Sequence, residues 1–254
     1  MKHWYVTVVS MILFVTPAMW SMNVEPLSAS FAPTGRDSIR TYRITNTQTE
    51  AIAVRIRTTS RELERNGDET RNPVEDEFLV FPGRLLLQPG QTQAVRVQWR
   101  GGAVTQEQAY RIIFEQVAVE DIDEDEGSGG GVTLSFMYRY VGAVYITPPD
   151  ATGSVVLNSA TGVGNPDRSG GVTEFRLLFE NPGTKHTVVR DARIAIEGTT
   201  PDGRAYREEF DAESLPVLSG TNLLAGSRIE QTVQLSEAIL PSTVEVTPNL
   251  TVSP

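Results

Sequence analysis

Apolar residues alternate with polar ones through much of this 254-residue chain. The segments "AVRIRT" (53–58), "AVRVQW" (94–99) and "YRIIFEQVAV" (110–119) carry β-branched or aromatic side chains at every second position, which is typical of half-buried strands. Turn signals such as "PTG" (33–35) and "NGD" (66–68) separate the strand-like segments. Because almost no segment has helical periodicity, short strands with frequent turns predict an all-β protein built from sandwiches.

The segment "PPDATGS" (148–154) interrupts the series of strand-like segments and divides the chain into two parts. Proline blocks ladder pairing and glycine loosens the backbone, so this segment indicates a linker or elbow. A second series of strand-like segments follows, from "GSVVLNS" to "TVEVTPNLTVS", with loosely similar turns but no clear repeat. We therefore predict two β-sandwich domains, over residues 23–148 and 150–254.

The first 21 residues have the features of a signal peptide. Lys2 supplies a positive charge, "WYVTVVSMILFVTPAMWS" supplies the apolar stretch, and Ala18 and Ser21 are the small residues of a cleavage site. An uncleaved anchor is disfavoured because the apolar run is short and Pro17 interrupts it. We expect an exported, soluble protein in the periplasm.

Composition narrows the functional classes. The chain has no cysteine, which excludes disulfides and cysteine metal sites, and its net charge of −10 disfavours nucleic acid as a partner. His186 is the only histidine outside the predicted signal and is expected to be a surface or turn residue. No G-x-S-x-G motif is present to supply a nucleophile. We predict a protein that is not an enzyme and has no cofactor.

The acidic, glycine-rich segment "EDIDEDEGSGGG" (120–131) resembles the start of a calcium-binding loop. The match fails because Glu126 stands where that motif requires glycine, and Val132 stands where it requires a bidentate glutamate. The acidic neighbours also exclude a phosphate site. We predict a solvated loop and no metal site.

A long β-prone run follows this loop. One face of the run carries a row of large apolar side chains: Val132, Leu134, Phe136, Tyr138 and Tyr140. The other face carries Thr133, Ser135, Met137 and Arg139. Two interpretations remain open from these residues: the apolar row fills the core of its own domain, or an edge strand lends the row to another protein.

The order of several segments resembles the periplasmic chaperones of pilus and fimbria assembly, of the chaperone–usher type. The segments are "FPGRLLLQPGQTQAVRVQW" (81–99), "EQAYRIIFEQVAV" (107–119), "YRYVGAVYITPP" (138–149) and "RLLFENPGTKHTVV" (176–189). The resemblance implies two immunoglobulin-like β-sandwich domains set at an angle. It also implies binding of a pilus or fimbrial subunit by donor-strand complementation and delivery of that subunit to an outer-membrane usher. On this resemblance the subunit-binding donor residues are Val132, Leu134, Phe136 and Tyr138.

The resemblance fails at one feature. Many members anchor the subunit's C-terminal carboxylate with a basic pair, but the corresponding positions fall near Ser28 and near Gly142 or Ala143, none of which is basic. Arg139 and Arg111 are the nearest basic residues on strands that would line the cleft. Since arginine can bind a carboxylate with two parallel hydrogen bonds, these two are the candidate carboxylate anchors.

Two alternatives stay open at this stage. A secreted two-domain immunoglobulin-like adhesion or binding module would share the sandwich pattern but give no role to the long strand. A sandwich-fold enzyme would need an aromatic sugar platform or a carboxylate pair, and Trp99, the only tryptophan outside the predicted signal, argues against the platform. In the chaperone interpretation, self-association of the free protein would protect an exposed donor strand.

Overall fold

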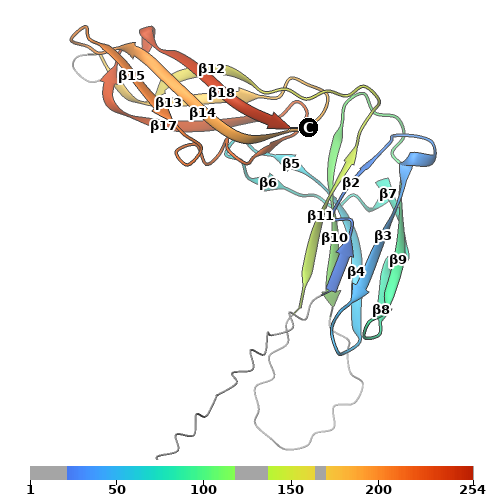
Figure 1. The fold of residues 1–254 in the computed structure, drawn as a ribbon. Helices are drawn as coiled ribbons and strands as arrows, with labels where there is room; N and C mark the ends of the chain where they lie inside the picture. The colour runs from blue at the N-terminus through green and yellow to red at the C-terminus, as the bar shows by residue number, and fades with distance from the viewer. Residues whose placement is uncertain (1–21, 118–136, 164–169, 254) are drawn as a thin grey trace, which may run out of the picture.

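The computed structural model describes residues 22–117, 137–163 and 170–253, which form two β-sandwiches that meet at an angle (Figure 1). Within these ranges the only helical segments are three 3-10 turns, η1 (Arg36–Ser38), η2 (Glu75–Glu77) and η3 (Pro241–Thr243). None of the helices described is long and apolar enough to cross a membrane. The all-β prediction is confirmed, and residues 1–21, the predicted signal, lie outside the description.

The first sandwich consists of two facing sheets. One sheet has the order β1 (Met22–Glu25), β3 (Ile39–Asn46), β9 (Thr92–Trp99), β7 (Phe78–Phe81). The other has the order β2 (Ser28–Phe31), β11 (Arg139–Ile146), β10 (Gln108–Val117), β4 (Ile52–Ser60), β8 (Arg84–Leu87). A separate small hairpin contains β5 (Glu62–Leu63) and β6 (Glu69–Thr70). The predicted segments at 53–58 and 94–99 therefore lie in β4 and β9, and the segment at 110–119 lies in β10 as far as it is described, with residues 118 and 119 outside the description.

The core of the first sandwich follows from the period-two pattern. Even-numbered side chains of β4, β10 and β11 point inward, as the buried residues Ile56, Phe114 and Val144 show. The buried rings of Tyr42 and Phe114 lie 5.5 Å apart in this core. Because burying each such side chain contributes about 2 kcal/mol, the alternation decides which face of each strand turns inward.

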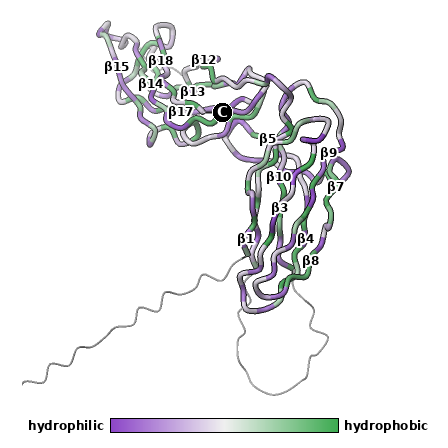
Figure 2. Tube along the Cα trace, turned by 45° about the vertical axis from the view of Figure 1, so that its right-hand side comes forward, coloured by the Kyte–Doolittle hydropathy of each residue, from purple (hydrophilic) through white to green (hydrophobic). Residues whose placement is uncertain are grey.

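The second sandwich has its own two sheets and its own buried cluster. One sheet has the order β12 (Val156–Val163), β13 (Val172–Glu180), β17 (Arg228–Ile239). The other has the order β15 (Ala205–Phe210), β14 (Thr187–Thr199), β16 (Asn222–Leu223), and β18 (Glu245–Ser253) also pairs with β14. Figure 2 shows apolar residues alternating with hydrophilic ones along the strands of both sandwiches.

A fully buried asparagine ends β3 and organises the corner of the first sandwich. The side-chain amide of Asn46 donates to the carbonyl oxygens of Glu50 at 2.7 Å and Leu87 at 3.0 Å. Its backbone carbonyl accepts the N–H of Gly90 at 2.9 Å, and its own N–H donates to Gln91 at 2.9 Å. Gly90 has a φ of 73°, a conformation that glycine adopts without strain.

The second sandwich repeats this arrangement around Asn181, which directly follows β13. Its side-chain amide donates to the carbonyl oxygens of Lys185 at 2.8 Å and Leu223 at 3.0 Å. Its backbone carbonyl accepts the N–H of Gly226 at 2.9 Å, and Gly226 has a φ of 71°. The two domains therefore share a structural corner although the sequence shows no clear repeat.

We predict that Asn46→Ala and Asn181→Ala each lower the free energy of unfolding by about 2–3 kcal/mol, because one buried and one partly buried backbone carbonyl lose their donor at each site. Urea unfolding followed by circular dichroism measures the change. Asn158→Ala is the matched control, because the Asn158 amide bonds Glu180 in an exposed position and its loss should cost under about 0.5 kcal/mol. Equal stability of the buried-site and control variants would contradict the structural role.

Candidate functional site

Strand β11 lies near the edge of its sheet, and only part of its outer side is paired. Strand β2 pairs in parallel with β11 from Ala143 to Ile146, beginning where the Ala143 N–H donates to the carbonyl of Leu27 at 2.7 Å. In an antiparallel ladder alternate residues bond the neighbouring strand, so Arg139 and Val141 direct their backbone groups away from β10. No described strand pairs with that segment, which leaves an open sheet edge (Figure 1).

Glycine at position 142 allows β2 to approach. A Cβ atom at Gly142 would lie 2.9 Å from Cγ2 of Ile112 and 3.0 Å from the carbonyl oxygen of Leu27. Both contacts are shorter than side chains tolerate. A larger residue would push β2 away from β11, so Gly142 marks the point where the paired part of the edge begins.

The predicted donor residues lie mostly beyond the described chain. Val132, Leu134 and Phe136 fall within 118–136, outside the described residues, as does the acidic segment 120–131. Tyr138 is described: it is half-buried, and its carbonyl accepts the N–H of Gln116 at 2.9 Å. The donor assignment therefore stays a prediction for all four residues.

Tyr138 belongs to the even-numbered positions of this strand, as do Tyr140, Val144 and Ile146. Val144 and Ile146 are buried in the first core, and Tyr140 packs against it. By period two, Tyr138 and Tyr140 therefore share the inward-facing side of β11 with Val144 and Ile146.

On the outward face of the same sheet, Arg111 lies beside Ser28 and Ala143, the positions where the family's basic anchor pair was expected and is absent. The register pairs Arg111 on β10 with Ala143 on β11, and Ala143 with Ser28 on β2. Arg139 pairs instead with Glu115, four residues or about 13 Å along β11 from Ala143. Of the two candidate anchors, Arg111 is thus the one in the corner between the domains, and the anchoring role of each stays a prediction.

Arg111 binds a carboxylate of the protein itself. Its Nε donates to Oε1 of Glu69 at 2.8 Å and its Nη2 donates to Oε2 at 2.5 Å. Arg61 Nε donates to Oε2 at 2.8 Å, and Arg71 Nε donates to Oε1 at 2.5 Å. We call Arg61, Glu69, Arg71 and Arg111 the arginine cluster.

The arginine cluster shifts the titration of its carboxylate. Burial raises the pKa of Glu69, but the hydrogen bonds and charges of Arg111, Arg71 and Arg61 outweigh it and lower the pKa from 4.5 to about 2. Glu69 is therefore ionised throughout the ordinary pH range. Sequence reasoning missed it because nothing local marks a glutamate that meets its arginine 42 residues away.

The first sandwich matches a known protein family. Residues 32–150 match the family described as "Pili and flagellar-assembly chaperone, PapD N-terminal domain". The match covers most of the first sandwich and slightly less than half of the chain. The probable fimbrial chaperone EcpE of Escherichia coli O18:K1:H7 (strain IHE3034 / ExPEC) is 26% identical over 182 residues, which cover 71% of this chain and 73% of that protein.

Solved structures of pilus-assembly chaperones are similar in fold to this chain. The Class 5 fimbriae chaperone CfaA has a TM-score of 0.53 at 13% identity, covering 90% of this chain and 99% of that one. One chain of the Salmonella enterica SafA pilin–SafB chaperone complex has a TM-score of 0.53 at 14% identity, covering 94% of this chain and 99% of that one. At these identities the likeness shows the fold, and it confirms two immunoglobulin-like sandwiches.

The junction between the sandwiches corrects the sequence-based expectation for His186. His186 lies in the connection before β14, but its side chain is largely buried and not on the surface: its ring stacks on Tyr145 at 4.1 Å, and its Nδ1 lies 2.5 Å from Oε1 of Glu107. Glu107 also accepts from the backbone N–H of His186 at 2.9 Å and the hydroxyl of Thr147 at 2.7 Å. Burial raises the pKa of Glu107, but these donors outweigh it and lower the pKa.

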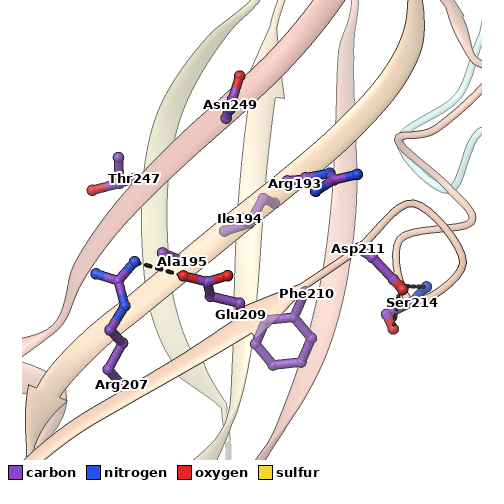
Figure 3. Close-up of a pocket in the computed structure, with 10 residues that line it drawn as sticks. All are labelled: Arg193, Ile194, Ala195, Arg207, Glu209, Phe210, Asp211, Ser214, Thr247 and Asn249. Atoms are coloured by element: carbon purple, nitrogen blue, oxygen red, sulfur yellow. Dashed lines mark hydrogen bonds and ion pairs between the residues drawn. The ribbon is translucent and has the colours of Figure 1, made fainter.

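A pocket of about 480 Å³ lies on the second sandwich, over β14, β15 and β18 (Figure 3). Its arginines are already paired with neighbouring acids: Arg207 with Glu197 and Glu209, and Arg193 with Asp191 at 3.8 Å. The described residues also contain no group of three acidic or histidine side chains that could hold a metal ion. Neither observation supplies a binding role for this face.

We predict that the stability difference between the wild type and Glu69→Gln narrows as pH falls from about 5 to about 2. The folded pKa lies below the unfolded value of 4.5, so the charge of Glu69 stabilises the fold above 4.5 and loses that effect as pH falls toward 2. The full difference should be about 3 kcal/mol, measured by urea unfolding at pH 6, 4 and 3. A difference in the free energy of unfolding between the two proteins that stays constant with pH would contradict the lowered pKa of Glu69.

Proposed function

We propose that this protein is a periplasmic chaperone that binds pilus or fimbrial subunits by donor-strand complementation and delivers them to an outer-membrane usher. The main support for the proposal is that strand β11 is only half paired, with an open edge at Arg139 and Val141. In the sequence this edge directly follows the apolar row of Val132, Leu134, Phe136 and Tyr138. The family and the relatives named as fimbrial chaperones support this role.

The physical basis is complementarity between two incomplete surfaces. A subunit that lacks one strand exposes an unpaired sheet edge and an apolar groove, both of which promote aggregation. A strand supplied by the chaperone satisfies the backbone groups, and side chains at every second position fill the groove. The function is thus binding and not catalysis, and it requires no cofactor.

The proposed anchor for the subunit is Arg111, with Arg139 as the second candidate. Arg111 lies in the row of Ser28 and Ala143, where β2 closes the edge of β11. A chain paired along the open edge cannot continue past that point, so its end would lie beside Arg111. Arginine forms two parallel hydrogen bonds with a carboxylate, which suits it to hold such an end.

We predict that Leu134→Ser combined with Phe136→Ser abolishes recovery of a candidate pilus subunit when the two proteins are co-expressed and co-purified. The two substitutions remove the apolar groups that fill the groove, and recovery should fall at least about ten-fold. Thr133→Ala combined with Ser135→Ala, on the opposite face, is the matched control and should leave recovery unchanged. Normal recovery with the first pair, in a folded protein, would refute the donor assignment.

We predict that Arg111→Ala weakens the complex at least about ten-fold, whereas Arg139→Ala weakens it less, because only Arg111 lies where the edge closes. Titration of the purified subunit against each variant measures both effects. A larger loss with Arg139→Ala would move the anchor to the outer end of β11. No loss with either variant would exclude both residues.

A further inference from the structure

The arginine cluster carries more positive charge than its one carboxylate neutralises. Arg61, Arg71 and Arg111 each form an ion pair with Glu69, and none of the three is paired with any other acid in the described part of the chain. The side chains of Arg61 and Arg111 are only 9% and 18% exposed. Cations so largely removed from water are costly unless anions accompany them, so the site favours binding of a further carboxylate.

The hairpin that carries Glu69 contacts both sandwiches. Glu69 lies on the β5–β6 hairpin, in the corner between the sandwiches (Figure 1). The hairpin residue Leu63 packs against the core of the second sandwich, and the carbonyl of Arg65 accepts the N–H of Glu230 at 2.6 Å. Through Glu69 the same hairpin is tied to Arg111 on β10 of the first sandwich.

A second contact links the cluster to the other domain. Arg61 Nη1 donates to the hydroxyl of Tyr145 at 3.0 Å, and the side-chain amide of Asn222 donates to the same hydroxyl at 2.8 Å. Arg61 would therefore stay in place if Glu69 moved away, because its Nη1 has a partner outside the cluster. Arg111 has no hydrogen-bond partner for its guanidinium other than Glu69 among the described residues.

We propose that Glu69 is a resident carboxylate: it holds Arg61 and Arg111 in a binding geometry, and the carboxylate of a bound polypeptide displaces it from Arg111. The incoming group takes over the two parallel hydrogen bonds that Glu69 makes with Arg111. The displaced Glu69 keeps Arg71, which lies on its own hairpin and is the most exposed cation of the cluster. Occupation of the site thus releases Glu69 from Arg111 on β10, while the backbone bond from Arg61 to Ala109 and the hairpin's contacts with the second sandwich remain.

The assignment of the incoming carboxylate to a subunit's chain end rests on the proposed function, in which that end lies beside Arg111. The displacement of Glu69 by a carboxylate does not depend on it. Two small probes distinguish the sources. N-acetylglycine carries a chain-terminal carboxylate, and N-acetylaspartic acid α-amide carries a side-chain carboxylate. N-acetylglycinamide is the neutral control.

The experiment titrates each probe into the full-length mature protein and follows the Nε–Hε NMR signals of Arg61 and Arg111. In Glu69→Gln the competing charge is absent, so N-acetylglycine should shift the Arg111 signal at a concentration at least ten-fold lower than in the wild type. Glu62→Gln, on the same hairpin but outside the cluster, should behave as the wild type. Adding Arg111→Gln to Glu69→Gln should abolish the shift that N-acetylglycine causes in the remaining Arg61 signal.

Several results would overturn the proposal. These are equal half-saturating concentrations in the wild type and Glu69→Gln, a response that survives Arg111→Gln, or an equal response to the neutral amide. If Glu69→Gln fails to fold, Glu69→Asp shortens the side chain while keeping its charge and should give an intermediate shift of the titration. If the subunit co-purifies but no probe displaces Glu69 from Arg111, only this inference is refuted and the proposed function stands. If a probe displaces Glu69 but no subunit co-purifies, the proposed function is refuted and this inference stands.

Discussion

The half-paired state of strand β11 is the constraint on which the rest of this protein depends. Strand β2 pairs with β11 from Ala143 to Ile146, and no other strand in the described ranges pairs with the outer side of β11 before Ala143. One end of β11 is therefore fully paired in its sheet, and the other end has an open edge. Its even-numbered side chains, Val144 and Ile146, are anchored in the core of the first sandwich. That anchoring fixes which face the preceding residues present, since alternation along a strand cannot be reversed without a register slip.

The two domains are coupled by polar contacts that meet on this strand. Thr147 and Tyr145, at the end of β11, contact Glu107 and His186 respectively, and the hydroxyl of Tyr145 receives hydrogen bonds from both domains. Buried polar groups of this kind depend on each other because each loses its partner if the other moves. The corner where a bound chain would end is therefore also the place where the angle between the sandwiches is held.

Much of the architecture was predictable because local patterns carry it. Alternation identified β4, β9 and β10, and the turn at 66–68 lies between β5 and β6. The corner asparagines were less accessible: Asn46 and Asn181 look like ordinary turn residues, and their equivalence appears only when their long-range partners Leu87 and Leu223 are known. The burial of the His186 side chain was missed for the same reason, since Glu107 and Tyr145 lie far from it in sequence.

The amino-acid sequence by itself determined the strands, the two-sandwich class and the apolar row at Val132, Leu134, Phe136 and Tyr138, because side-chain alternation and turn chemistry are properties of neighbouring residues. Only the tertiary structure decided that Arg111 lies opposite Ala143, that Glu69 occupies it, and that β2 leaves part of β11 open. These features depend on strand register and on contacts between segments distant in the chain, and no local pattern specifies them.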